Sequence, residues 1–336
     1  MTERWVHAIE QAWLAPPRLL LLLAPLEWVF AALTALRRRA YRQGWRKSSH
    51  PGTPVVVVGN LLVGGTGKTP VVIALVQALE ERGMRVAVVS RGYGGNYTGV
   101  QRVHERSDAQ QVGDEALLIA RSIGGPVYVA RDRAAAAQAA AADGAGLIVC
   151  DDGLQHYGLA RDIEIVTIDR DVGFGNGHLL PVGPLREPRR RLANVDFLLE
   201  RGGLDPFTGL RFEPIRFRRL GSEEARSLNT LEFAAGVHAL AAIARPGRFF
   251  DTLEKLGIPA QTHALKDHEA LSDELLASLA DKPLIMTSKD AVKCTPDVHP
   301  DAWVLEMAVV FPSGFVNALQ SRLATLTNDL APEGAS

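Results

Sequence analysis

The chain has 336 residues, of which 47% are apolar, and its formal net charge at pH 7 is −1. This length accommodates two domains of ordinary size with hydrophobic cores, and the charge excludes a global electrostatic attraction to nucleic acid. The two cysteines, Cys150 and Cys294, lie far apart in the sequence. This spacing argues against a disulfide framework and favours a reducing compartment.

The amino-terminal segment, residues 1–50, is predicted to form a membrane-associated helix. Residues 14–36 are almost wholly apolar apart from interruptions such as Pro25 and Glu27, and arginines interleaved with aromatic residues follow them. An apolar helix with a basic, aromatic flank suits the anionic cytoplasmic face of a membrane, whereas a core helix with a solvated basic end is the alternative. A spanning helix needs roughly 20 apolar residues, so the interrupted run 19–36 favours a helix that lies in or dips into one leaflet.

Strand and helix patterns alternate through residues 51–225, which we predict to be a first α/β domain with a connector. The expected strands are Val55–Val58, Arg85–Ser90, Val127–Ala130, Leu147–Cys150 and Ile163–Ile168, and the expected helices are Pro70–Arg82 and Arg131–Ala142. Continuous β-branched runs separated by helices indicate a mostly parallel sheet with helices on both faces. P-loop nucleotide-binding proteins have this α/β architecture.

A second, smaller α/β domain is predicted for residues 226–336, after a connector that contains a strand at Leu210–Phe217. Its expected elements are strands at Val237–Ile243, Leu284–Thr287 and Trp303–Met307 and a helix at Phe249–Leu256. Two lobes with a cleft between them suit an enzyme that closes on two substrates.

The most informative motif follows the first predicted strand. Its residues are Gly64, Gly65, Thr66, Gly67, Lys68, Thr69 and Pro70. Backbone N–H groups of such a turn can surround a phosphate, Lys68 can reach the outer phosphates of a nucleotide, and the Thr69 hydroxyl can hold Mg²⁺. The loop has Leu62 where the usual pattern has glycine, and it resembles the loops of partitioning-type ATPases except that Val63 replaces their lysine. We expect a nucleoside triphosphate site rather than a glycine-rich turn without a ligand.

A second candidate site, Asp151 and Asp152, follows the predicted strand Leu147–Cys150. At the carboxyl end of a neighbouring parallel strand, these carboxylates would face the same crevice as the glycine loop. A P-loop site needs an acidic group there, on Mg²⁺ or on its water shell. A plain Asp-Asp-Gly turn is the alternative, and the nearby glycine loop favours the functional interpretation.

Four further charged residues lie in predicted loops or at a helix start. Arg91 follows the second strand and could meet an anionic substrate, and Asp114 could cap a helix. Glu187 lies in a stiff, proline-punctuated loop, and His268 follows Asp267 in the second lobe. A lone loop histidine usually has no role, but an adjacent or cross-domain carboxylate could make His268 a base poised near neutral pH.

Together, these motifs resemble tetraacyldisaccharide 4′-kinases, the lipid A 4′-kinases of Gram-negative bacteria. The resemblance runs from the apolar amino-terminal helix to about Met307. It rests on the glycine loop, R-G-Y-G-G from Arg91, V-G-D-E around Asp114, D-D-G-L-Q-H from Asp151, L-P-x-G-P-L-R-E up to Glu187, Asp267-His268 and a late Thr287-Ser288-Lys289-Asp290. D-D-G-L-Q-H is the most specific of these motifs.

The resemblance implies phosphoryl transfer from ATP to the 4′-hydroxyl of a tetraacylated glucosamine disaccharide 1-phosphate, in lipopolysaccharide biosynthesis. It also implies that residues 51–225 are a P-loop kinase domain, that ATP and Mg²⁺ are the cofactors, and that the chain attaches to the cytoplasmic face of the inner membrane. We expect no nucleic-acid ligand and no obligate protein partner.

The resemblance further implies roles for the residues of the nucleotide site. The glycines of the loop would hold the nucleotide, Lys68 would neutralise charge on the β- and γ-phosphates, and Thr69 would ligate Mg²⁺. Asp151, Asp152 and Glu187 would order the metal and its waters, with their division of labour left open.

For the acceptor side, the resemblance implies that Asp114 and His268 take the proton from the attacking hydroxyl. Because they belong to different lobes, domain closure would assemble this base, and Arg91 would lie near the disaccharide or its phosphate. The chain departs from the family pattern at Glu269, where a second histidine is common, and at Ser288, where glutamate is common.

Other protein classes remain alternatives. A membrane-associated partitioning ATPase also combines a P-loop with a membrane helix, although Val63 argues against it. A GTP-binding module carries N/T-K-x-D, whereas Lys289 and Asp290 are adjacent here. A structural protein with a relic loop is disfavoured because Lys68 and Thr69 are both retained.

Overall fold

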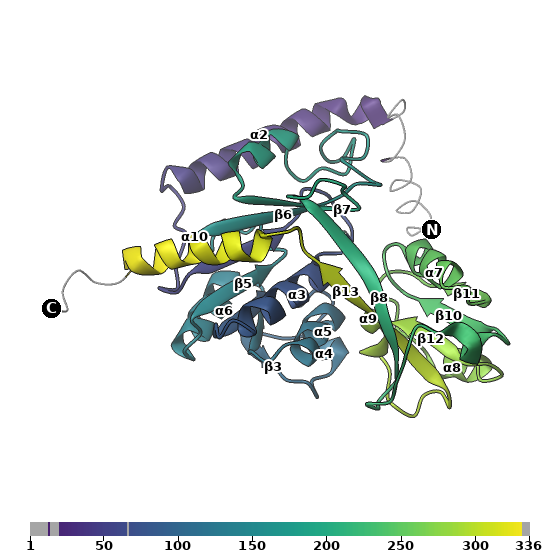
Figure 1. The fold of residues 1–336 in the computed structure, drawn as a ribbon. Helices are drawn as coiled ribbons and strands as arrows, with labels where there is room; N and C mark the ends of the chain where they lie inside the picture. The colour runs from purple at the N-terminus through teal and green to yellow at the C-terminus, as the bar shows by residue number, and fades with distance from the viewer. Residues whose placement is uncertain (1–12, 14–19, 66, 331–336) are drawn as a thin grey trace.

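The computed structural model describes residues 13, 20–65 and 67–330, and its described strands form one 13-stranded sheet that passes through two lobes (Figure 1). The first lobe contains, in spatial order, β3 (Val100–Val103), β4 (Val127–Ala130), β2 (Val86–Ser90), β5 (Leu147–Asp151), β1 (Val55–Gly59), β6 (Ile163–Asp169) and β7 (Phe197–Arg201). Neighbouring strands in this lobe pair in parallel, except that the edge strand β3 is antiparallel to β4.

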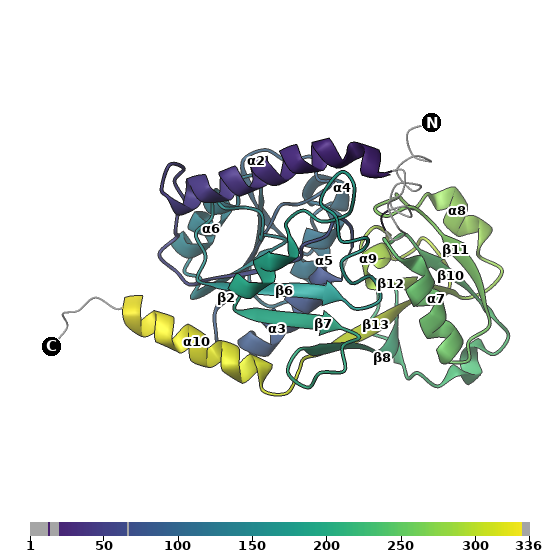
Figure 2. The same cartoon turned by 90° about the horizontal axis from the view of Figure 1, so that it is seen from above.

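The sheet continues into the second lobe through a long antiparallel ribbon. Its strands follow in the order β8 (Gly209–Arg219), β13 (Ala302–Val310), β12 (Leu284–Thr287), β10 (Val237–Ala241) and β11 (Ala260–Ala264), and the short β9 (Ala225–Arg226) pairs with β8. The β8 strand begins in parallel pairing with β7 and continues antiparallel to β13, so the same strand belongs to both lobes (Figure 2). The lobes are therefore joined by backbone hydrogen bonds as well as by the chain.

Helices cover both faces of the first-lobe sheet. One face packs against α3 (Lys68–Glu80) and α5 (Asp114–Ser122), which follows the short α4 (Ala109–Val112), and the other face packs against the alanine-rich α6 (Arg133–Ala142). Apolar residues at helical spacing, such as Val72, Val76 and Leu79 of α3, are fully buried against the strands. The predicted α/β class, a mostly parallel sheet with helices on both faces, is confirmed.

The second lobe has its own core. Its helices are α7 (Pro246–Lys255), α8 (Asp273–Ser278) and α9 (Ser288–Ala291), with the 3₁₀ turn η3 (Thr230–Phe233) before β10. The other 3₁₀ turn of this part of the chain, η2 (Arg189–Asn194), precedes β7 in the first lobe. Phe217, Phe233 and Trp303 pack edge to face in this core, with ring centroids 5.0 and 6.1 Å apart along the series. Large aromatic side chains bury much apolar area, which helps a small lobe to form a core.

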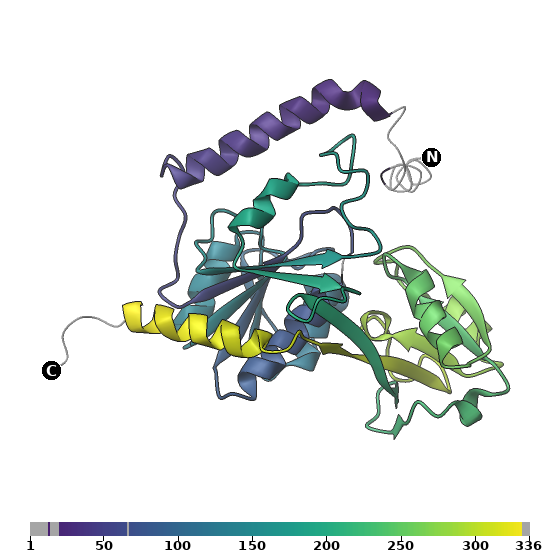
Figure 3. The ribbon, with the colours of Figure 1, turned by 45° about the horizontal axis from the view of Figure 1, so that its top comes forward.

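The final helix, α10 (Phe315–Leu330), returns to the first lobe (Figure 3). Phe315, Leu319 and Leu323 join the first-lobe core, and the Phe315 ring lies 5.3 Å from that of Phe197 in β7. Residues at the end of the range 226–336 thus pack on the P-loop side. The boundaries of the two domains stay a prediction.

The amino-terminal helix lies alongside the first lobe, apart from the sheet (Figure 3). It comprises the 3₁₀ turn η1 (Leu20–Leu23) and α2 (Ala24–Arg42), and no side chain in either is buried. Residues 20–42 are long and apolar enough to cross a membrane, by length and composition only. Residues 1–12 and 14–19 of the predicted segment lie outside the described residues.

Glu27 attaches α2 to the rest of the protein. Its carboxylate accepts a hydrogen bond from the Leu179 amide at 2.7 Å and lies 3.0 Å from Nδ1 of His178. The opposite side of the helix exposes large apolar residues, including Leu22, Trp28 and Leu33. Glu27, which interrupts the apolar run in the sequence, therefore docks the helix against the loop that leads to Glu187.

Candidate active site

The glycine loop joins β1 to the amino terminus of α3. Gly64 and Gly67 have φ angles of +99° and +76°, a left-handed conformation that favours glycine. Gly67 caps α3, which begins at Lys68, two residues before the predicted start at Pro70. Free backbone N–H groups and the positive end of the helix dipole make such a terminus suitable for phosphate. Thr66, one of the predicted nucleotide-binding residues, lies outside the described residues.

Lys68 and Thr69 both line the interlobe cleft. The Lys68 ammonium donates to Oδ1 of Asn60 at 3.2 Å and lies 3.4 Å from Oδ1 of Asp152. The structure therefore brings the predicted lysine and one of the predicted carboxylates together.

Asp151 and Asp152 lie where β5 ends, beside β1, as the parallel arrangement requires. The Asp151 side chain is buried, and its Oδ1 has no hydrogen-bond partner among the described residues. Burial, with the nearby charges of Glu115 and Asp152, raises the pKa of Asp151 to about 7. A cation bound beside this carboxyl group would favour its ionised form, so Asp151 is suited to contact one.

Asp152 has a left-handed φ of +47°, so its carboxylate turns into the cleft entrance toward two cations. Nη1 of Arg186 lies 3.2 Å from Oδ2 of Asp152, in addition to the Lys68 contact. Burial acts to raise the pKa of Asp152, but the charges of Lys68 and Arg186 outweigh it and hold this pKa below its ordinary value. Asp152 thus stays anionic and orients Lys68.

The donor set at this edge of the sheet fits a magnesium ion. Among the described residues, no group of three or more His, Cys, Asp and Glu side chains could hold a metal by itself. Mg²⁺ is commonly held by one or two protein oxygens together with substrate phosphates and water. The unpartnered Oδ1 of Asp151 and the Thr69 hydroxyl, both on the cleft, match this requirement.

The surroundings of Glu187 do not match the metal-ordering role predicted for it. Its carboxylate is fully buried and accepts hydrogen bonds from the Tyr157 hydroxyl at 2.8 Å and from Nε2 of Gln155 at 3.2 Å, with Arg191 3.5 Å away. The oxygens that would face a metal are thus bonded to protein. Gln155 also accepts from Arg186 at 3.3 Å, so Glu187 supports the group that contacts Asp152.

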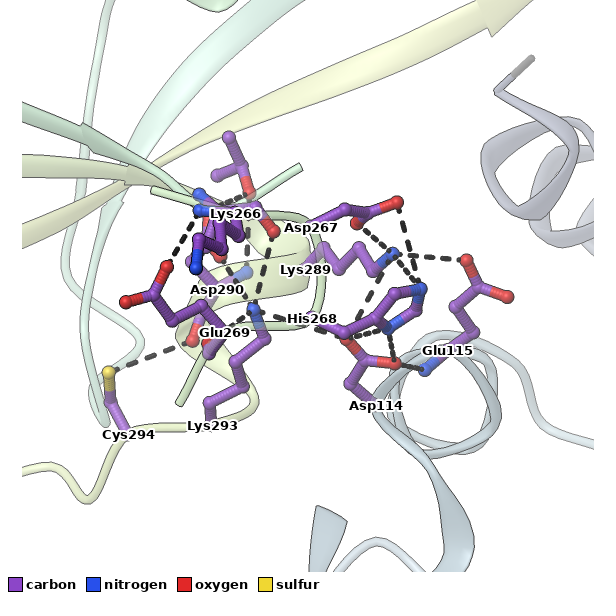
Figure 4. Close-up of polar contacts among 12 residues, drawn as sticks. Asp114, Glu115, Lys266, Asp267, His268, Glu269, Lys289, Asp290, Lys293 and Cys294 are labelled. Atoms are coloured by element: carbon purple, nitrogen blue, oxygen red, sulfur yellow. Dashed lines mark hydrogen bonds and ion pairs between the residues drawn. The ribbon is translucent and has the colours of Figure 1, made fainter. Parts of the chain in front are cut away.

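A second set of charged groups joins the two lobes across the cleft (Figure 4). Asp114 is the first residue of α5, where Gly113 rather than Asp114 occupies the capping position. His268 comes from a loop of the second lobe, with φ of +64°, and its Nδ1 lies 3.0 Å from both carboxylate oxygens of Asp114. The two residues predicted to act together are therefore in direct contact.

Lys289 is the functional candidate that the sequence did not assign (Figure 4). Its ammonium lies 3.1 Å from Oε1 of Glu115 on α5, 3.0 Å from Oδ1 of Asp267 and 3.3 Å from Nε2 of His268. Only its place in the late Thr-Ser-Lys-Asp motif marked it in the sequence. Lys289 bridges the first lobe to the histidine loop.

The protonation of this pair follows from its contacts. The hydrogen bond to Asp114 raises the pKa of His268 above its ordinary value. Burial acts to raise the pKa of Asp114, but His268 and Lys289 outweigh it and lower this pKa. The ion pair is therefore complete between the lowered pKa of Asp114 and the raised pKa of His268.

One open cleft of about 2370 Å³ lies between the lobes. Lys68, Asp152, His268 and Lys289 line it, and Arg91 is exposed on its wall. Tyr93, close to Arg91 in the sequence, places its ring 5.2 Å from that of His268. The cleft is large enough to hold a nucleotide and a second substrate together.

The fold and the site define the class of P-loop phosphotransferases. A glycine loop with lysine and threonine opens onto a carboxylate pair on the adjacent strand. A carboxylate–histidine pair, formed by Asp114 of the first lobe and His268 of the second, has the composition of an acid–base group. This combination of a phosphate cradle and a proton acceptor is what transfer to a hydroxyl requires.

Comparison with known proteins identifies the family. The family model described as tetraacyldisaccharide-1-P 4′-kinase matches residues 19–324. The tetraacyldisaccharide 4′-kinase of Methylobacillus flagellatus is 41% identical over 96% of this chain and 97% of its own length. That of Aeromonas salmonicida is 45% identical over 95% of this chain and 97% of its own length. The chain belongs to the tetraacyldisaccharide 4′-kinase family, as its motifs predicted.

A solved structure agrees with this assignment. The crystal structure of LpxK from Aquifex aeolicus in complex with ATP matches 92% of this chain and 99% of that chain, with a TM-score of 0.77 and 26% sequence identity. The likeness covers both lobes, so the overall arrangement is shared with a protein crystallised with ATP.

Proposed function

We propose that this chain transfers the γ-phosphoryl group of ATP to the 4′-hydroxyl of a tetraacylated glucosamine disaccharide 1-phosphate, a step of lipid A biosynthesis. One observation carries the mechanism: His268, held by Asp114, lines the same cleft as Lys68 and the β5 carboxylates. The family membership indicates the acceptor, and the cleft geometry supports a direct transfer between two bound substrates.

On the nucleotide side, the glycine loop and Lys68 hold the phosphates, and Asp152 orients the lysine. Thr69 and Asp151 would hold Mg²⁺, which when bound spreads the negative charge of the β- and γ-phosphates. Because phosphoryl transfer depends mainly on positioning and charge neutralisation, these groups carry most of the rate enhancement. Glu187 acts indirectly, through Gln155 and Arg186.

On the acceptor side, His268 is the proton acceptor and Asp114 orients it. The Lys289 ammonium is only a donor, so its contact with Nε2 of His268 is consistent with a neutral ring whose Nδ1–H donates to Asp114. The 4′-hydroxyl would replace Lys289 at Nε2 and give up its proton there. Arg91, exposed on the cleft wall, would contact the disaccharide or its phosphate.

The amino-terminal helix would bring the enzyme to its lipid substrate. Its exposed face carries Leu22, Trp28 and Leu33, and Arg37, Arg38 and Arg39 lie near its carboxyl end. Apolar side chains suit the acyl region, and arginines suit the anionic headgroups of a cytoplasmic leaflet. We propose attachment to the cytoplasmic face of the inner membrane, without an obligate protein partner.

The test is a transfer assay. Purified chain, γ-labelled ATP and the tetraacyl disaccharide 1-phosphate in detergent micelles should give a labelled lipid, and omission of the disaccharide should abolish it. Hydrolysis of ATP without a labelled lipid would contradict the proposal and favour a partitioning-type ATPase.

A further inference from the structure

Three arginines gather in the cleft where the first lobe meets the start of α7. Arg201 ends β7, Arg245 precedes α7, and Arg248 lies in its first turn. All three line the same cleft as Gly67 and Lys68. The mechanism described above uses none of the three arginines.

Two of these arginines are paired with a single carboxylate. Asp169, at the end of β6, is almost fully buried, and Arg248 binds it through both terminal nitrogens, one of them at 2.6 Å. Arg245 lies 3.3 Å from the same carboxylate. The charges of Arg248 and Arg245 hold the pKa of Asp169 low although burial opposes this, so Asp169 stays fully engaged.

Arg201 is the third cation and has no such partner. Its guanidinium lies over the Phe212 ring, 4.1 Å from the centroid, and among the described residues no carboxylate lies within ion-pair distance of it. Burial and the neighbouring Arg248 lower the pKa of Arg201, although the charge of Asp169 acts in the opposite direction. A partly buried guanidinium without a carboxylate in direct contact is costly, so the site is suited to an anion.

The position of Arg201 identifies the anion. A Cβ placed on Gly67 would lie 3.2 Å from Nη1 of Arg201, so the guanidinium rests against the backbone of the phosphate loop itself. The first turn of α3 also lacks one amide donor, because Pro70 has no N–H. Loop and first-turn amides are the groups that bind phosphate in such a site, so this helix start offers one donor fewer, and Arg201 can supply others beside Gly67.

We propose that Arg201 is a nucleotide-binding residue that donates hydrogen bonds to phosphate oxygens of ATP beside Gly67. The inference rests on the proposed ATP-dependent function. A planar guanidinium offers two parallel N–H bonds to a phosphate, which add to the amide donors of the loop. The Phe212 ring supports the Arg201 guanidinium from beneath. The absence of a side chain at Gly67 leaves room for the guanidinium beside the loop.

The test compares nucleotide binding by the full chain and by Arg201→Gln, using calorimetry with ATP and with ADP and no lipid acceptor. Loss of charge-assisted hydrogen bonds should weaken both nucleotides about 10–100-fold. Arg201→Lys, which keeps the charge but not the fork, should fall between the parent and Arg201→Gln. The unfolding temperature without nucleotide should fall only slightly, since the Phe212 contact is lost but no ion pair is.

Arg189→Gln is the matched control. Arg189 also lies over a phenylalanine ring, 4.5 Å from the Phe174 centroid, and against a glycine of positive φ, Gly177, but it does not line the cleft. It should bind nucleotides as the parent does. Parent-like ATP and ADP affinity in Arg201→Gln would overturn the inference, and so would an equal loss of affinity for adenosine, which has no phosphate. A parent chain that binds no ATP would instead overturn the proposed function.

Discussion

The two sides of the cleft are built in different ways. The described residues of the nucleotide side come from two adjacent strands of the first lobe and the turns that follow them. They are Gly64, Gly65, Gly67, Lys68, Thr69, Asp151 and Asp152. The acceptor side depends on a contact between Asp114 and His268, which are 154 residues apart and belong to different lobes. We therefore expect the first lobe to supply most contacts to ATP, whereas Asp114 and His268 touch only because the lobes meet.

The largest expected effect comes from the nucleotide side. Lys68→Ala should abolish lipid phosphorylation and weaken ATP binding, because no other described cation contacts both Asn60 and Asp152 at the loop. Transfer of labelled phosphate and ATP calorimetry measure the two effects. Lys255→Ala, at an exposed position of α7, is the control and should behave as the parent. Equal ATP affinity in Lys68→Ala and the parent would remove Lys68 from its assigned role.

Removal of the acceptor-side base should be less severe. His268→Ala should lower kcat about 10²–10⁴-fold, the usual contribution of a general base, while ATP affinity stays at the parent value. Single-turnover transfer and ATP calorimetry separate these quantities. His104→Ala, an exposed first-lobe histidine, is the control. If His268→Ala lost ATP binding as Lys68→Ala does, the two sides of the cleft would not be independent.

The same contrast explains what the sequence could predict. The nucleotide side and the central strands were predicted because their signals are local: a buried β-branched run, a glycine turn and a helix start. β3 and β11 were missed because they lie at the sheet edges, where Val100–Val103 and Ala260–Ala264 are largely exposed and lack a continuous apolar run. Edge strands are specified by their single neighbour more than by their own composition.

The acceptor side was predicted only through resemblance to the family. Asp114 and His268 were named, but the partners of Lys289 lie 174 and 22 residues away, and no local pattern could pair them. The resemblance implied that Glu187 would order the metal and its waters, yet Tyr157, Gln155 and Arg191 take up its carboxylate. The anchoring role of Glu27 could not be predicted either, because its partners come from a loop that is distant in the sequence.

The pH dependence tests how the acceptor side is tuned. If neutral His268 is the base, kcat/KM rises as pH increases through the raised pKa of His268. Asp114→Asn removes the hydrogen bond that raises this pKa, so the acidic limb should move to lower pH. Lys289→Met removes a charge that lowers it, so the limb should move to higher pH.

A pH profile of kcat/KM for each variant measures these shifts, and His268→Ala should flatten the limb. The free energy of unfolding should also depend on pH. The stabilisation that His268 contributes is present below pH 6.5 and is lost as pH rises through its raised pKa. Shifts of the same direction in Asp114→Asn and Lys289→Met would contradict the assigned electrostatics.

The smallest effect concerns the interlobe ion pair. Glu115 and Lys289 lie 3.1 Å apart, and the Glu115 side chain is 33% exposed, so solvent screens their attraction. A double-mutant cycle with Glu115→Gln and Lys289→Met should give a coupling of about 0.2–1 kcal/mol in the free energy of unfolding. Lys289 keeps Asp267 as a partner when Glu115 is changed, which limits the coupling further. A coupling of zero in unfolding, together with a parent-like pH profile for Glu115→Gln, would mean that the Glu115–Lys289 pair does not help to hold the lobes together. The β8–β13 ribbon and the Asp114–His268 contact would then join them.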